Sequence, residues 1–155
     1  MREYLFRGKR AFKLWRDKDP WIYGSLIQAK DYCCILDPDE EDDMDYPYLD
    51  GDLGTIDGEA TPVIPETVGQ FTGMYDKNGK RIFEGDIVYA KMDYGPAGFI
   101  DRVVDISFKK KDGYRWEYFD LDTIVVIGNV HDNIELLNVD TNVTDILKGV
   151  THETS

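Results

Sequence analysis

Short apolar runs separated by turn residues follow one another along the chain, as is typical of β-strands, and apolar and polar positions alternate over residues 99–109. Aromatic and β-branched runs at residues 4–8 and 21–27 predict a first hairpin. Residues 32–36 and 61–64 predict a third and a fourth strand, which pair with each other across the segment between them. No run of helical periodicity precedes Asp132. We therefore expect a mainly β protein.

The second half of the chain carries the clearer turn signals. Asn78-Gly79 separates two apolar runs, and this pair tolerates positive φ at both central positions of a type I′ turn, so it predicts a tight hairpin. Further strands are expected at residues 99–109 and 114–119. The continuous aliphatic run at residues 123–130 predicts a strand that is covered on both faces and is therefore central.

Short strands separated by turns about every ten residues are typical of a small β-barrel. We expect an SH3-like barrel here, followed by a short helical segment whose first turn covers residues 134–137. The chain then has three parts: an N-terminal β region over residues 1–67 with an acidic loop at 37–58, a barrel-like domain over 68–137, and a C-terminal tail over 138–155.

Charge is distributed very unevenly. The chain has 31 acidic and 18 basic residues in 155, a net charge of −13, which opposes binding to nucleic acid or anionic lipid. Residues 31–76 hold 14 acidic residues and no basic one, so 17 acidic and 18 basic residues elsewhere leave +1. Gly and Pro interrupt this stretch, which predicts a solvated loop. We expect residues 39–52 to be removable without loss of the fold.

Composition also narrows the class of protein. A content of 42% hydrophobic and 13% aromatic residues excludes a disordered chain. Arg2 and Glu3 place charge at the start, and the longest aliphatic run is residues 124–127. Neither a secretory signal nor a membrane span is therefore expected, and the protein should be cytoplasmic.

Metal and cofactor sites have little support. Adjacent cysteines such as Cys33-Cys34 rarely bridge each other, and a zinc site needs about four ligands, which His131 and His152 do not complete in any known motif. We expect two buried, reduced thiols and no cofactor.

The acidic run invites a calcium interpretation, because Asp37, Asp39 and Glu41 imitate the opening of an EF-hand loop. The loop fails at its sixth position, where Asp42 replaces Gly, and at its twelfth, where Tyr48 replaces Glu. A solvated loop is the default, and a loose divalent-cation site is the alternative.

Catalytic motifs are missing from the sequence. It contains no Gly-x-Ser-x-Gly elbow, no phosphate-binding loop of the Walker type and no His-Glu-x-x-His. Carboxylates are abundant, but none is singled out by apolar neighbours. We expect the protein not to be an enzyme.

Two charged stretches are candidates for interaction. Basic and aromatic side chains alternate near the start, as on surfaces that bind nucleic acid, and residues 109–111 add three lysines. This first interpretation is a surface that binds nucleic acid. In the second, which we favour, the basic residues compensate the acidic run within the chain or across a subunit contact, and the aromatic residues belong to the core. The candidate residues are Arg7, Arg10, Trp15 and Trp21 in the basic stretch and Asp39, Glu40, Glu41, Asp42 and Asp43 in the acidic one.

Five sequence motifs occur together in a characteristic order and spacing over residues 2–137. They are FRGKR at residues 6–10, WIYGSL at 21–26, PETVGQFTG at 65–73, DKNGKRIFEGDIV at 76–88 and VIGNVHDN at 126–133. In these motifs the chain resembles the YopX family of phage and prophage proteins. The resemblance implies a cytoplasmic accessory protein with a β-rich N-terminal part, a barrel-like C-terminal part and self-association. It supplies no catalytic or binding residues, and the acidic run and the tail lie where the family pattern is loose.

Two functional hypotheses follow. The first is a non-catalytic module that binds a host or phage protein and forms a homo-oligomer, because segregated charge can orient partners at a contact. The second is a role linked to nucleic acid, either through the basic N-terminal stretch or through mimicry of DNA by the acidic run.

Overall fold

The structure, a computed structural model, describes residues 5–12, 19–37 and 60–138. The chain divides into two compact units, Met1–Phe71 and Thr72–Ser155, which we call unit 1 and unit 2. Each unit is described by itself. Within the described residues, no helix is both long and apolar enough to cross a membrane.

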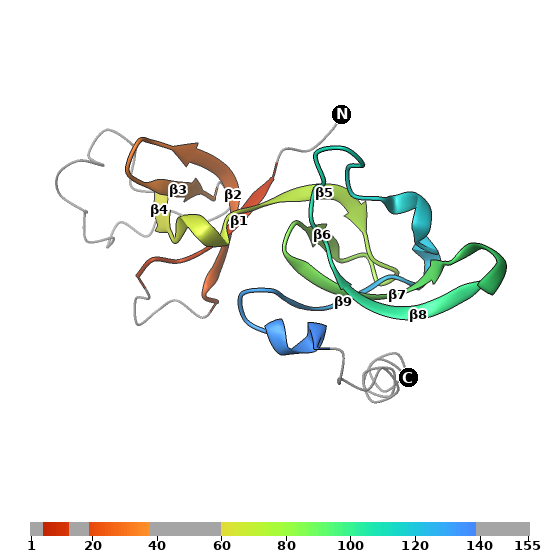
Figure 1. Ribbon diagram of the computed structural model, residues 1–155. Helices are drawn as coiled ribbons and strands as arrows, with labels where there is room; N and C mark the ends of the chain where they lie inside the picture. Colours follow the sequence, from red (N-terminus) through yellow and green to blue (C-terminus); the bar gives the residue numbers. More distant parts are fainter. Residues whose placement is uncertain (1–4, 13–18, 38–59, 139–155) are drawn as a thin grey trace. The chain divides into compact units, whose positions relative to one another are not determined.

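Antiparallel strands and short 3₁₀ helices make up the described residues, which confirms the expectation of a mainly β protein (Figure 1). The strands are β1 (Phe6–Lys9), β2 (Trp21–Gln28), β3 (Cys33–Leu36), β4 (Ala60–Val63), β5 (Gly69–Tyr75), β6 (Arg81–Phe83), β7 (Asp86–Asp93), β8 (Phe99–Asp105) and β9 (Val125–Asn129). The 3₁₀ helices are η1 (Pro65–Thr67), η2 (Gly95–Ala97), η3 (Trp116–Tyr118), η4 (Leu121–Thr123) and η5 (Ile134–Leu137).

Unit 1 is built on one antiparallel sheet with the order β4-β3-β2-β1-β5. The predicted first hairpin is confirmed by the pairing of β1 with β2, and the pairing of β3 with β4 across the acidic loop is confirmed as well. Gly24 lets β2 and β3 approach, since a Cβ there would lie 2.0 Å from the backbone oxygen of Leu36. Gly8 does the same against Val63, whose Cβ would be 2.9 Å away.

The core of unit 1 is small. Buried Ile22, Cys33, Ile35 and Val63 form one cluster, and half-buried apolar side chains pack around it. Thr67 ties the end of the sheet to η1, because its hydroxyl accepts a hydrogen bond from the backbone N of Lys9 at 2.8 Å. Burial of this cluster on β2, β3 and β4, with half-buried Phe6 of β1 packed against it, explains why the aromatic and β-branched runs predicted those strands correctly.

Unit 2 contains the three-stranded sheet β8-β7-β9 and the hairpin in which β5 pairs with β6. Strand β7 is the middle strand, and its first five residues are buried. The predicted central position of residues 123–130 is therefore wrong, since β9 lies at an edge of this sheet. The core of this unit consists of Ile82, Val88, Ala90, Ile106 and Ile124.

The expected SH3-like barrel is not closed. A barrel needs its first and last strands to pair, but β8 and β9 are held apart by β7 and both lie at edges among the described residues. Residues 114–119, which were expected to be a strand next to β8, contain the 3₁₀ helix η3 instead. Their aromatic side chains pack on the core of unit 2 from a turn, so aromatic content misled the strand prediction.

The turn at Asn78-Gly79 is a hairpin turn, but not of type I′. Only Gly79 has positive φ there, at 81°, and the backbone N of Gly79 donates to Asp76 O at 3.0 Å. The backbone N of Asp76 in turn donates to Lys80 O at 2.8 Å. This is a three-residue loop, a type I turn followed by a left-handed glycine. The carboxylate of Asp76 selects it by bonding the backbone of the loop, as described below.

A single 3₁₀ turn, η5, occupies Ile134–Leu137 and begins after Asn133. It lies at the residues where a first helical turn was expected, but it does not extend into an α-helix within the described residues. The rest of the expected helical segment and most of the tail fall outside the described residues.

Candidate interaction surface

Arg7 and Trp21 lie in the interior of unit 1. Arg7 is 6% exposed and Trp21 8%, and the Arg7 Cζ lies 4.9 Å from the centroid of the Trp21 ring. The pairing of Lys9 with Trp21 makes Arg7 and Trp21 diagonal neighbours across β1 and β2. A cation held over an indole in this way supports the fold. These two side chains therefore offer little surface to a partner.

Arg10 is half-buried and fixes the loop before β2. Its Nε donates to the backbone oxygen of Asp19 at 3.1 Å, and its backbone N donates to Pro20 O at 2.8 Å. The remaining candidates, Trp15 and the acidic residues Asp39, Glu40, Glu41, Asp42 and Asp43, lie outside the described residues.

In the motif DKNGKRIFEGDIV, the two aspartates at its start and near its end make hydrogen bonds that stabilise the fold. Asp76 is buried, and its Oδ1 accepts from the backbone N of Asn78 and of Lys80, each at 2.9 Å. Its Oδ2 accepts from the backbone N of Val126 at 3.1 Å. Asp86 is buried too and accepts from the backbone N of Phe83 at 2.8 Å. These carboxylates join turns to strands and leave little capacity for chemistry on a ligand.

The motif VIGNVHDN is structural in the same sense. Asn129 Oδ1 accepts from the backbone N of His131 and of Asp132, both at 2.9 Å. Asn133 Oδ1 accepts from the backbone N of Asn129 at 3.2 Å. Gly128 is required beside Asn133, because a Cβ there would lie 2.7 Å from that oxygen. The motif thus shapes the turn after β9.

Cys33 and Cys34 are reduced and buried on β3. Burial, and then the neighbouring Cys33, raises the pKa of the Cys34 thiol. A thiol with a raised pKa is held in its protonated form and is a poor nucleophile and metal ligand. Among residues 5–12, 19–37 and 60–138, no group of three or more His, Cys, Asp or Glu side chains is arranged to hold a metal ion.

Tyr89 makes the shortest polar contact on the sheet of unit 2. Its hydroxyl donates to Asp101 Oδ1 at 2.6 Å across β7 and β8. Burial, followed by the hydrogen bond and the charge of Asp101, raises the pKa of Tyr89 to about 12. The phenol is therefore protonated at neutral pH, and the contact locks the two strands together.

The distal part of the β7–β8 hairpin is the exposed apolar surface that these strands create. Val88 and Ala90 bury one face of β7 in the core, and the register continues that face outward to Met92, paired with Ile100. Ile100 is 41% exposed, and Tyr94, which follows the end of β7, is 44% exposed. The apolar face of the sheet therefore extends beyond the core that covers its base.

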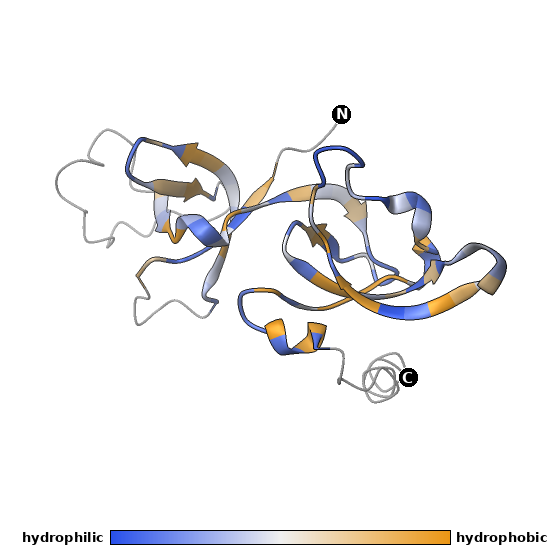
Figure 2. Cartoon of the chain, viewed as in Figure 1, coloured by the Kyte–Doolittle hydropathy of each residue, from blue (hydrophilic) through white to orange (hydrophobic). Residues whose placement is uncertain are grey.

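Two further side chains complete this surface. Phe99 is the cross-strand partner of Asp93 and lies on the other face of the hairpin from Ile100; it is 60% exposed. Arg102 places its Cζ 5.8 Å from the centroid of the Tyr94 ring. Figure 2 shows that β8 begins with a hydrophobic segment and becomes hydrophilic towards its middle. We call this surface the hairpin patch: Met92, Tyr94, Phe99, Ile100 and Arg102.

Sequence reasoning missed the hairpin patch. A strand was expected from residue 99 on, but nothing was predicted about the exposure of the apolar residues beside the turn at residues 94–98. A signal was present, since an aromatic residue stands on each side of a Gly-Pro-Ala-Gly turn, at Tyr94 and Phe99. Aromatic residues next to a hairpin end are far from a strand's core contacts, which indicates exposure.

Comparison with known protein families gives a match to a family model. A family model described as YopX protein matches residues 17–138, which is most of the chain. The motif at residues 6–10 lies before the matched range. No curated protein matches the chain.

Proposed function

The chain belongs to the YopX family, and from its hairpin patch we propose that it is a non-catalytic protein that binds another protein. We place it among the accessory proteins that phages and prophages produce in the bacterial cytoplasm. The motifs shared with the family are used for turns and close packing in the described residues, so they do not form a reaction centre. A binding surface is the function best supported by what the chain exposes.

One observation carries this proposal. Strand β8 lies at the edge of an open sheet among the described residues, and its first two residues, Phe99 and Ile100, are exposed. Proteins usually protect an edge strand, because an exposed apolar edge pairs with other chains. An edge that keeps Phe and Ile exposed is suited to a partner that adds a strand and buries those side chains.

The partner strand belongs to a different protein rather than to a second copy. Symmetric antiparallel pairing of β8 with itself places one residue opposite its own copy. Centring at Asp101 or at Arg102 opposes like charges, and centring at Val103 sets Asp101 against Asp105. Like charges directly opposite each other destabilise a sheet. Centring at Ile100 or at Val104 avoids this, but it pairs only three residues of β8 with those of the copy. The hairpin patch is thus better matched to an extended segment of another protein.

Self-association is a separate part of the proposal, and it would use charge. The acidic stretch at residues 31–76 and the balanced remainder of the chain allow complementary contacts between copies. Sedimentation of the full chain at low and high salt tests this, because salt screens such contacts. A monomer at micromolar concentration under both conditions contradicts self-association without affecting the hairpin patch.

The binding role is tested by cross-linking the full chain in host cells and identifying the proteins attached. Phe99→Asp with Ile100→Asp should abolish the cross-linked partner. Phe12→Asp is the matched control, since it places the same charge on an exposed apolar residue of unit 1. If both variants retain the partner, or if the control loses it equally, the hairpin patch is not the binding surface. Turnover of a small molecule by the purified chain contradicts the non-catalytic part.

A further inference from the structure

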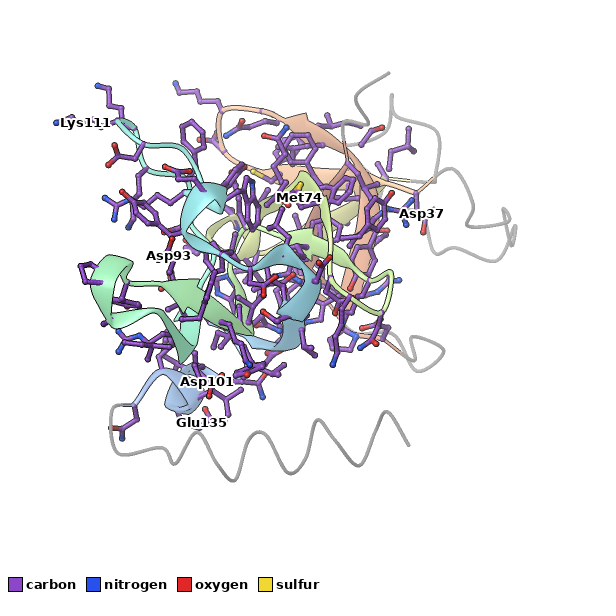
Figure 3. All side chains as sticks on the ribbon, turned by 90° about the vertical axis from the view of Figure 1, so that its right-hand side faces the viewer. Asp37, Met74, Asp93, Asp101, Lys111 and Glu135 are labelled. Carbon is purple, nitrogen blue, oxygen red and sulfur yellow. The ribbon has the colours of Figure 1, made fainter. Side chains whose placement is uncertain are left out.

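A second surface of unit 2 combines positive charge with aromatic rings. Lys109, Lys110 and Lys111 are exposed in a turn that closes on itself: the backbone N of Lys109 donates to Gly113 O, and that of Gly113 to Lys109 O, both at 2.8 Å. Lys111 projects away from the surrounding strands in Figure 3. We call residues 109–113 the lysine turn. Because its backbone is fixed, the three ammonium groups extend from a defined base.

A row of four aromatic rings begins beside the lysine turn. Its ring centroids are 5.2 Å apart for Phe108 and Tyr114, 5.6 Å for Tyr114 and Trp116, and 5.7 Å for Trp116 and Phe119. Tyr114, Trp116 and Phe119 pack against the core of unit 2. Phe108 is different, because it stands at the outer end of the row and is 60% exposed. The row anchors one accessible ring next to three lysines.

Two acidic groups near the turn, Asp112 and Glu84, are engaged by other side chains. Asp112 Oδ2 accepts from Arg115 Nη2 at 2.9 Å, and Glu84 Oε1 accepts from the Tyr114 hydroxyl at 2.7 Å. Residues 106–119 carry four basic and two acidic side chains in total. The local charge around Phe108 is therefore positive, although the whole chain is negative.

The backbone conformation of Arg115 is a further indication that this surface has a function. Its φ is 60° and its ψ 38°, a left-handed conformation that glycine adopts without steric cost and arginine does not. Among the described residues it is the only non-glycine residue with positive φ. Strained backbone at a polar surface position is commonly associated with a functional constraint. Here the residue retained in that conformation is a cation beside the lysine turn.

We propose that the lysine turn and Phe108 bind single-stranded nucleic acid. Lysine ammonium groups act as point charges for successive phosphates, and an exposed ring offers its face to an unstacked base. A duplex keeps its bases stacked and cannot use Phe108 in this way. An acidic protein segment would satisfy the lysines but would not need the ring. The combination of the two features therefore favours a single strand.

The overall charge of −13 makes this binding weak and dependent on salt. A single strand loses affinity with a slope of about −0.7 per phosphate contact on a double-logarithmic scale. With about three to four contacts, binding weakens about 20- to 50-fold between about 50 mM and about 200 mM salt. The acidic stretch at residues 31–76 repels the strand over a Debye length of about 14 Å at about 50 mM salt and about 7 Å at about 200 mM, so its effect is smallest at the higher salt concentration.

The test is fluorescence anisotropy of a labelled oligothymidylate of about 12 nucleotides, titrated with the full chain. Replacing Lys109, Lys110 and Lys111 by Ala should abolish saturable binding. Phe108→Leu keeps an apolar side chain of similar size without the aromatic face, and it should weaken binding about tenfold, in line with the loss of one stacked base. Lys77→Ala with Lys80→Ala is the matched control, because it removes exposed lysines from the hairpin turn at Asn78-Gly79, also in unit 2.

Each outcome decides the proposal. Loss of binding in the triple variant and in Phe108→Leu, with binding intact in the control, supports it. An unchanged affinity in Phe108→Leu, together with equal competition by polyglutamate of the same charge, overturns it in favour of a general polyanion or acidic-protein site. Absence of any binding at about 50 mM salt overturns it outright. Circular dichroism of every variant establishes that the fold is retained, and the hairpin variant Phe99→Asp with Ile100→Asp should bind the oligonucleotide normally.

Discussion

Units 1 and 2 use their aromatic and charged residues in opposite ways. In unit 1, Arg7 and Trp21 are turned inward, and the cluster around Ile22 and Ile35 lies on the other face of the same strands. In unit 2, aromatic side chains extend from the core to the surface. Of the large exposed hydrophobic side chains in the described residues, three lie in unit 1 and eight in unit 2. Interaction surfaces are therefore to be sought in unit 2.

The difference shows that a conspicuous motif and an interaction surface need not coincide. Gly8 and Gly24 belong to motifs that resemble the family, and both are needed where strands approach closely. Phe99 and Phe108 belong to no such motif, and both are exposed. Residues that define the fold and residues that contact partners are thus separate sets in this chain. The predictions below change one set or one unit at a time.

The largest effect is expected for Asp76→Ala in unit 2. The variant leaves the backbone N–H groups of Asn78, Lys80 and Val126 without their carboxylate, which should lower the free energy of unfolding by about 3–5 kcal/mol. Hydrogen exchange should accelerate in unit 2 and remain unchanged in β2 and β3. Asp76→Asn, which retains one acceptor oxygen, should lose less. Equal acceleration in both units contradicts the separation of their cores.

Gly24→Ala is the matching change in unit 1. The new Cβ would stand 2.0 Å from the backbone oxygen of Leu36, so β2 and β3 must separate at a cost of about 2–3 kcal/mol. Urea denaturation followed by hydrogen exchange should locate the loss in unit 1. Ser25→Ala, at the exposed neighbouring position, is the control and should be nearly neutral. A stable Gly24→Ala protein would show that the close approach of the strands is not required.

An effect that depends on pH should arise from Tyr89. Its pKa is raised from 10.0 to about 12, so its contribution to stability is complete below pH 10 and is lost as the pH rises towards 12. Between pH 10 and about pH 11 the loss should be about 1 kcal/mol. Tyr89→Phe has no proton to lose and should lack this component. Denaturant midpoints at both pH values measure the difference, and parallel profiles would contradict it.

The smallest effect is a gain in stability. Arg115→Gly removes the left-handed strain of an arginine and should raise the free energy of unfolding by about 0.5–1 kcal/mol, since the exposed Arg115–Asp112 ion pair contributes little. Thermal melting measures it. Lys110→Gly is the control, because φ is not positive there and glycine should destabilise. The same Arg115→Gly protein should bind oligothymidylate more weakly, so that stability and binding change in opposite directions.

Sequence patterns predicted unit 1 better than unit 2 for a physical reason. In unit 1 the short aromatic and aliphatic runs are themselves the buried strands, as at Ile22, Cys33 and Ile35, so apolar runs report burial directly. In unit 2, Tyr114, Trp116 and Phe119 reach the core from a 3₁₀ turn, without the alternation of a strand. The aromatic type of these residues correctly indicated that they are partly buried, but it did not indicate that their backbone forms a 3₁₀ turn rather than a strand.

The turn at Asn78-Gly79 was misassigned because the residue pair was considered without Asp76, whose Oδ1 bonds the backbone N of Asn78 and of Lys80. The burial of Asp76 could not be foreseen either, because its Oδ2 bonds Val126, 50 residues later in the sequence. The hairpin patch was missed for a related reason. Alternation predicted a strand from residue 99 on but does not say where the core that covers it ends, and Ile100 is exposed. Where a strand extends past its core, periodicity alone overestimates burial.

Asp76 also imposes an order of events on folding. Its bonds to Asn78 and Lys80 close a loop of a few residues, which is a fast, local process. Its bond to Val126 has to wait until β9 has docked beside β7, which requires closure of a much longer loop and is entropically slower. One carboxylate therefore takes part both in an early turn and in a late step. During synthesis, the turn can form as soon as its residues have left the ribosome, but Asp76 acquires its full set of partners only after residue 126 has followed.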